Sequence, residues 1–183
     1  AIDILARVDE QFVDYRDLAE YHLGSIYEGL LEYHLAAIEP EDGWTVALEN
    51  EKGERKQTGS YYTPNYIVKY IVEQTLGPLL RAAITDKASA RAKVDAILGI
   101  NVVDPAMGSG YFLVEATEQI ARFLVDQGLA PDTPEVDEAD LAYWKRRVVQ
   151  SCVYGVDINP LAVDLAKLSL WLGTVAKDKP LSF

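Results

Sequence analysis

Glycine and acidic residues at two points of the sequence have the types and spacing of a nucleoside-binding site. Gly108 and Gly110 follow a short apolar run, and glycine lets a backbone approach a bound molecule closely because it has no Cβ atom. Asp157 follows a second apolar run, where a carboxylate can accept hydrogen bonds from both hydroxyls of a ribose. Together these residues predict a ligand that resembles a nucleoside.

The spacing argues against a dinucleotide ligand. The pattern G-x-G-x-x-G would need glycine where Leu113 stands, and Asp157 lies 47 residues after Gly110 instead of about 20. Asp104 opens the turn with a negative charge, which would repel a pyrophosphate but suits a ligand with sulfonium and ammonium groups. S-adenosylmethionine is therefore the cofactor that fits best.

Alternating strands and helices must position these residues. The pattern over 100–126 predicts a strand, a glycine turn and a helix. A polar, proline-broken insertion at 128–140 precedes a short helix near 139–150, and a second buried strand then ends at Asp157. The order strand, helix, strand, helix implies a parallel βαβ unit with a right-handed crossover, and thus an α/β fold.

The last predicted helix begins after that second strand. Asn159 is a typical capping residue, and Pro160 suits the first helical position, where its missing N–H costs nothing. Four leucines lie on one stripe of this helix, namely Leu161, Leu165, Leu168 and Leu172.

Upstream of the glycine turn, the pattern predicts a more helical region. Helical spacing over 17–37 indicates an amphipathic helix, and residues 44–48 alternate as in a half-buried strand. A further helix is expected from about Thr63 as cap and Pro64 as first residue, weakening at Gly77-Pro78. Residues 82–98 then predict another helix.

Three motifs, in order, resemble those of adenine-specific DNA methyltransferases. Asp104-Pro-Ala-Met-Gly-Ser-Gly-Tyr-Phe-Leu is similar to their cofactor motif and Tyr154-Gly-Val-Asp-Ile-Asn-Pro to the acidic motif that follows it. Gly59-Ser-Tyr-Tyr-Thr-Pro resembles the segment placed before them, and residues 17–37 resemble the preceding stretch in large restriction–modification enzymes of the Eco57I-like group. This resemblance implies part of a Rossmann-like S-adenosylmethionine-dependent methyltransferase fold, preceded by a mainly helical N-terminal segment.

The resemblance also implies roles for individual residues. Those expected against the methionine end of the cofactor are Tyr62, Thr63 and Pro64. Those expected along the methionine and the sugar are Asp104, Ala106, Gly108 and Gly110. Asp157 would hold the ribose hydroxyls and Ile158 would pack on the adenine ring.

One motif of these enzymes is absent. They hold a flipped adenine with Asn/Asp-Pro-Pro-Tyr/Phe, whereas this sequence contains no Pro-Pro pair. We therefore expect an N-terminal helical segment with a short strand or hairpin at 1–57, and an S-adenosylmethionine-binding methyltransferase domain at 58–183 that stops before the catalytic motif. By this interpretation the chain holds no catalytic residue, does not methylate alone, and belongs to an enzyme that binds double-stranded DNA through other regions.

Composition and charge limit the remaining functions. The net charge of −12 argues against free-standing affinity for DNA, and the excess acid is concentrated in residues 1–54, which hold 14 acidic and 3 basic residues. One cysteine and two histidines predict no metal site and no internal disulfide. The sequence shows neither a membrane span nor a signal peptide, so a cytoplasmic protein is expected, whereas it indicates no oligomeric state.

Simpler interpretations stay open beside these. The glycine turn could be a tight βα turn without a ligand, Asp157 could merely cap the last helix, and Cys152 could merely pack. Lys145-Arg146-Arg147 fits a solvated helix face better than a phosphate contact. The alternative functions are a methyltransferase for a protein glutamine amide and a non-catalytic interaction module with the same fold.

Overall fold

The computed structural model describes residues 63–129 and 140–174 in full, and before them the backbone of four short strands. These strands form two antiparallel pairs, β1 (Arg7–Val8) with β2 (Gln11–Phe12) and β3 (His34–Ile38) with β4 (Thr45–Glu49). The strand predicted at 44–48 is thereby confirmed.

The helix predicted over 17–37 is wrong at its C-terminal end. Residues 34–37 belong to β3, which pairs with β4 from His34 opposite Glu49 to Ile38 opposite Thr45. The helical spacing of apolar residues does not predict this strand, because strand formation depends on the backbone hydrogen bonds that a partner strand supplies. The rest of that predicted helix, 17–33, lies outside the described residues.

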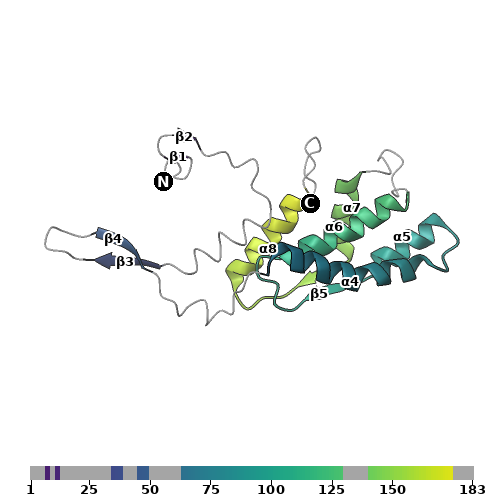
Figure 1. Cartoon of the computed structure of the whole chain (residues 1–183), viewed down its shortest axis with the longest axis horizontal. Coiled ribbons are helices and arrows are strands. Elements are labelled where there is room, and N and C mark those ends of the chain that lie inside the picture. The colour runs from purple at the N-terminus through teal and green to yellow at the C-terminus, as the bar shows by residue number, and fades with distance from the viewer. Residues whose placement is uncertain are drawn as a thin grey trace.

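The elements after residue 63 are helices with two strands, β5 and β6, between them along the chain (Figure 1). Parallel strands β5 and β6 pair with Val102 opposite Val153 and Asp104 opposite Gly155, with two helices between them along the chain, so the predicted parallel strand–helix–strand order is confirmed. The elements are α4 (Asn65–Ile84), α5 (Ala90–Leu98), β5 (Val102–Asp104), α6 (Tyr111–Asp126), α7 (Leu141–Ser151), β6 (Val153–Gly155) and α8 (Pro160–Gly173).

Helix α4 continues through the proline that was expected to weaken it. Pro78 has no N–H to donate, but Leu76 and Leu80 are buried on either side of it, so packing outweighs the lost hydrogen bond. The Thr75 hydroxyl also donates to the carbonyl oxygens of Ile71 and Val72. The expected helix over 82–98 is therefore two elements: α4 ends at Ile84, and α5 begins after Ser89, whose hydroxyl accepts from the Ala92 N–H.

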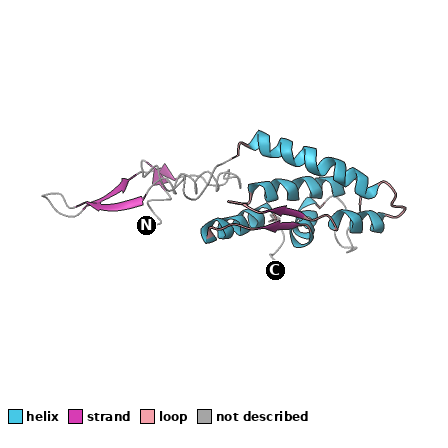
Figure 2. Ribbon diagram, turned by 90° about the horizontal axis from the view of Figure 1, so that it is seen from below, coloured by secondary structure: helices cyan, strands magenta, loops and turns pink. Residues whose placement is uncertain are grey.

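One hydrophobic core joins the helices to the sheet. Helices α4, α5, α6 and α7 pack together, and the long helices α4 and α6 lie on one side of the two strands (Figure 2). Trp144, Ile97 and Ile120 are the large side chains at its centre, each at most 1% exposed. The Tyr143 ring meets the Trp144 ring edge to face, with centroids 5.2 Å apart. This core holds the carboxyl ends of β5 and β6 in fixed positions.

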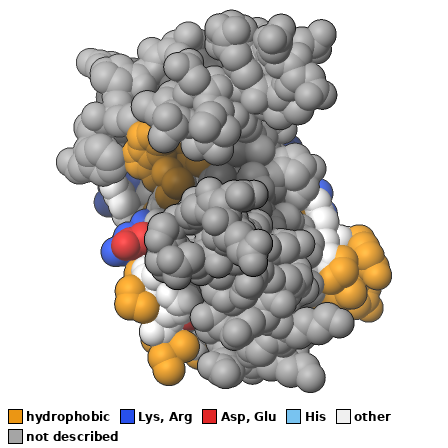
Figure 3. Space-filling view, turned by 90° about the vertical axis from the view of Figure 1, so that its left-hand side faces the viewer, with side chains coloured by type: hydrophobic (Ala, Val, Ile, Leu, Met, Phe, Trp, Pro, Cys, Tyr) orange, Lys and Arg blue, Asp and Glu red, His pale blue; other side chains and the backbone are white. Residues whose placement is uncertain are grey.

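The opposite face of the sheet is open among the described residues, so the expectation of two buried strands is wrong for this face. Val103 and Tyr154, which pair across the strands, are 65% and 53% exposed. Helix α8 likewise buries Ala162, Ala166 and Ser169, whereas the predicted leucine stripe is largely exposed. Hydrophobic side chains accordingly reach the surface in separate patches (Figure 3).

Candidate functional site

The glycine turn follows β5 and leads directly into α6. The Asp104 carboxylate accepts a hydrogen bond from the Ala106 N–H at 3.1 Å, and Gly110 N–H donates to the Met107 carbonyl at 2.8 Å. Gly108 and Gly110 both lie in the left-handed region, with φ of 53° and 82°. Glycine is the residue that adopts this conformation without strain, which explains both glycines of the motif.

The two glycines differ in their surroundings. A Cβ atom built on Gly108 would meet no atom of the described residues within 4 Å, so that part of the structure leaves the space beside this turn open. A Cβ atom on Gly110 would lie 2.9 Å from the Ala166 Cβ and 3.1 Å from its Cα. Gly110 is therefore required for the close approach of α8, whereas Gly108 leaves room for another molecule.

Asp157 lies two residues after the end of β6 and contacts the glycine turn. One carboxylate oxygen accepts from the Gly108 N–H at 2.8 Å, and the other accepts from the Asn159 N–H at 2.8 Å. The Asn159 side chain caps α8 by accepting from the Leu161 N–H at 3.0 Å. The structure thus brings Asp157 and Gly108 together, and the helix cap is Asn159 instead of Asp157.

The other predicted cofactor residues lie at the starts of helices or on the surface. Thr63 is half-buried, and Pro64 immediately precedes α4, where its carbonyl accepts from the Ile67 and Val68 N–H groups. Pro64 is itself the N-terminal cap, so the expected capping role of Thr63 is wrong. Ala106 is exposed and Ile158 is 93% exposed, whereas Tyr62 lies outside the described residues.

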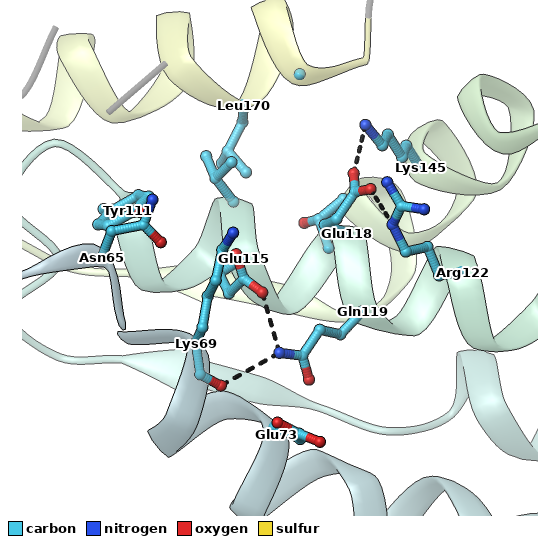
Figure 4. A pocket seen from close by; sticks show the side chains of 13 residues that line it. Asn65, Lys69, Glu73, Tyr111, Glu115, Glu118, Gln119, Arg122, Lys145 and Leu170 are labelled. Carbon is cyan, nitrogen blue, oxygen red and sulfur yellow. Dashed lines mark hydrogen bonds and ion pairs between the residues drawn. The ribbon is translucent and has the colours of Figure 1, made fainter. Parts of the chain in front are cut away.

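A cavity of about 560 Å³ lies beside α6 and is lined by four helices. Asn65 and Tyr111, the first residues of α4 and α6, face it at one end, and Glu118 lies at the other with Lys145 and Arg122 (Figure 4). The starts of these two helices, which carry the Thr-Pro segment and the glycine turn, therefore share one end of the cavity. Sequence reasoning missed this cavity, because it depends on how four separate helices pack.

Charged side chains hold α6 and α7 together beside this cavity. Glu118 forms ion pairs with Lys145 at 2.5 Å and with Arg122. Partial burial raises the pKa of Glu118, but the bonds and charges of Lys145 and Arg122 outweigh it and leave this pKa below 4.5. Arg146 donates to the Thr174 carbonyl at 3.4 Å. The prediction of a solvated helix face is therefore wrong for Lys145 and Arg146, which instead link α7 to its neighbours.

A second groove, of about 390 Å³, runs along β5 between α4 and α6. Its walls are mainly apolar and include Ile71, Leu79 and Phe112. The groove reaches Asp104 and Pro105 at the beginning of the glycine turn. The cavity thus reaches the start of α6, and the groove reaches the carboxyl end of β5.

The part of the chain that the structure describes contains neither a candidate metal site nor an exposed thiol. Within 63–129 and 140–174, no three His, Cys, Asp or Glu side chains gather into a potential metal site. Cys152 is fully buried, and burial raises the pKa of its thiol to about 11, so it stays protonated. In the same residues, no helix is long and apolar enough to cross a membrane.

Comparison with known proteins assigns the family. The family model described as N-6 DNA Methylase matches residues 19–180, so the chain belongs to this family and the resemblance inferred from three motifs is confirmed. No solved structure matches the chain.

Three relatives give the range of similarity. RM.MjaORFECS2P of Methanocaldococcus jannaschii is named as a type II restriction enzyme and methyltransferase. It is 29% identical over 153 residues, which cover 68% of this chain and 12% of that protein. The adenine-specific methyltransferase PglX of Streptomyces coelicolor is 22% identical over 170 residues, 88% of this chain and 12% of PglX. The type II restriction enzyme and methyltransferase RM.Eco57I of Escherichia coli is 25% identical over 173 residues, 87% of this chain and 16% of that protein. The chain thus spans less than a fifth of each relative.

Proposed function

We propose that this chain is the S-adenosylmethionine-binding portion of a cytoplasmic DNA adenine-N6 methyltransferase that serves a restriction–modification or phage-defence system. The family and the names of the three relatives support the reaction class. The observation that carries the proposal for this chain is the contact of Asp157 with the open glycine turn at Gly108.

The residues at the two strand ends fit the cofactor. The open space at Gly108 allows a ligand to approach the backbone, and each Asp157 oxygen has a second lone pair for a ribose hydroxyl. Asp104 adds a carboxylate at the start of the turn, which suits the ammonium group of the cofactor. Ile158 offers an exposed apolar side chain for the adenine ring.

When bound, S-adenosylmethionine supplies an electrophilic methyl group on a sulfonium. The residues of this chain would orient that group through the ribose and the methionine, with Thr63 and Pro64 at the methionine end. Correct orientation alone can contribute several kcal/mol to such a transfer. Reading and flipping of the adenine would belong to other regions of the whole enzyme, since this sequence has no Pro-Pro pair and a net charge of −12.

Calorimetric titration of this chain with S-adenosylmethionine tests the proposal. We expect binding to the unaltered chain and at least about tenfold weaker binding to Asp157→Ala, because a charged hydrogen-bond acceptor is lost. Gly108→Ala should also weaken binding. Gly128→Ala is its matched control, because φ at Gly128 is 60° and its Cβ would also meet no described atom within 4 Å. Absence of binding heat from the unaltered chain would contradict the proposal.

The same chain should not shift duplex DNA in a gel at physiological salt. The excess of acidic over basic residues makes association with a polyanion unfavourable. A stable shift would contradict the assignment of DNA contacts to other regions of the enzyme.

A further inference from the structure

Asp157 connects two turns that are far apart in the sequence. Its carboxylate accepts one backbone N–H from the glycine turn, at Gly108, and one from the turn before α8, at Asn159, both at 2.8 Å. Hydrogen bonds to a charged acceptor are stronger than those between neutral groups. We call this pair of hydrogen bonds the Asp157 clamp.

Packing does not hold the glycine turn at Gly108. No atom of residues 63–129 or 140–174 lies within 4 Å of the place where a side chain would stand, whereas Gly110, two residues on, lies against Ala166. A backbone hydrogen bond from Met107 N–H to the Val156 carbonyl, at 3.0 Å, ties the turn to the end of β6 just before Asp157. At Gly108 itself, the hydrogen bond to Asp157 is the interaction that fixes the direction of the N–H group.

We propose that Asp157 is a positioning residue, which holds the glycine turn in its cofactor-binding shape before the cofactor arrives. This inference rests on the proposed function and adds to the expected contact with the ribose. One lone pair of each carboxylate oxygen serves the clamp, and the other is left for a hydroxyl group. Binding to a preformed turn avoids the entropy cost of ordering it during association.

The clamp can be tested without any ligand. In the ¹⁵N-labelled chain, Asp157→Ala should raise the hydrogen-exchange rate of the Gly108 amide by about tenfold or more, because its acceptor is lost. Asn159→Ala is the matched control, since it removes the α8 cap but leaves both N–H groups and the Asp157 carboxylate in place. An unchanged Gly108 exchange rate in Asp157→Ala would overturn the inference, as would an equal increase in Asn159→Ala.

A second variant protects this test against a failure to fold. Asp157→Asn keeps one side-chain oxygen but replaces the other with an NH₂ group, which only donates and cannot accept from a backbone N–H. We expect faster exchange at Gly108 or at Asn159 in this variant, whichever loses its acceptor. Unchanged exchange at both amides would overturn the inference.

Cofactor analogues separate positioning from contact with the ribose. The probes are S-adenosylhomocysteine and its 2′,3′-dideoxy analogue, each titrated into the unaltered chain and into Asp157→Ala. A residue that only contacts the ribose would leave the affinity for the dideoxy analogue unchanged on substitution. The clamp predicts that Asp157→Ala weakens both ligands, the dideoxy analogue by about fivefold or more.

An unchanged affinity for the dideoxy analogue would therefore overturn the inference while leaving the proposed function intact. If the unaltered chain bound neither probe, the proposed function would fail, and hydrogen exchange at Gly108 alone would decide whether the clamp exists.

Discussion

Alanine substitution of three glycines measures how closely α8 approaches the glycine turn. Gly108, Gly110 and Gly128 all have positive φ, so alanine is strained at each of them by about 1–2 kcal/mol. Among these three, and counting the atoms of the described residues, the new Cβ collides only at Gly110, at 2.9 Å from the Ala166 Cβ. The difference between the three variants therefore isolates the packing of α8 against α6.

The expected losses of unfolding free energy follow from these distances. Gly108→Ala and Gly128→Ala should each cost about 1–2 kcal/mol, the strain of the left-handed backbone. Gly110→Ala should cost about 1–3 kcal/mol more, because overpacking forces α8 or the turn to move. Urea unfolding followed by far-UV circular dichroism measures all three, with an unchanged dependence on urea concentration showing that the same structure unfolds.

A double variant sharpens the measurement. Ala166→Gly removes the Cβ atom nearest to the new side chain at position 110, whereas the Cα atom of residue 166 stays 3.1 Å from it. The double variant should therefore recover part of the unfolding free energy that Gly110→Ala loses. The two substitutions should therefore be non-additive. If Gly110→Ala cost no more than Gly108→Ala and Gly128→Ala, the close approach of the two helices would be refuted.

Three further results are expected. Lys145 and Arg122 hold the pKa of Glu118 below 4.5, so Glu118→Gln should lower the unfolding free energy by about 1–2 kcal/mol at pH 7. This loss should fade as the pH falls below about 4.5, because the native carboxylate then becomes protonated. An equal loss at pH 3 and pH 7 would contradict this. Cys152, fully buried and with its pKa raised to about 11, should react with Ellman's reagent at pH 8 only after unfolding, so rapid modification of the native chain would show that it is accessible. Ser89→Ala should cost about 1 kcal/mol in urea unfolding through loss of the α5 cap and leave S-adenosylmethionine affinity unchanged, whereas weaker binding would show that α5 affects the site.

Local signals in the sequence predicted the glycine turn and its neighbour Asp157. The glycine turn is made by consecutive residues, and its conformation depends on Gly108 and Gly110 themselves. The meeting of Asp157 with this turn was also predictable, because parallel strands bring their carboxyl ends to one edge of the sheet. The family assignment confirms the motifs, whereas the cofactor roles of the individual residues stay predictions.

The features that were missed depend on contacts between distant segments. Helix α4 passes Pro78 because buried leucines on both sides hold it in the core, which the local propensity of proline cannot foresee. Residues 34–38 form a strand because residues 45–49 pair with them. Lys145 meets Glu118 across two packed helices, so a basic run that looked solvated serves as a link.

The open face of the sheet has a consequence for the behaviour of this chain in solution. Val103, Tyr154 and Val156 are each more than half exposed, and such apolar side chains favour contact between copies of the same molecule. A net charge of −12 opposes that contact by mutual repulsion, whose range shrinks to about 10 Å at 0.1 M salt. Raising the ionic strength should therefore promote self-association of this chain, so concentrated samples are best kept at low salt.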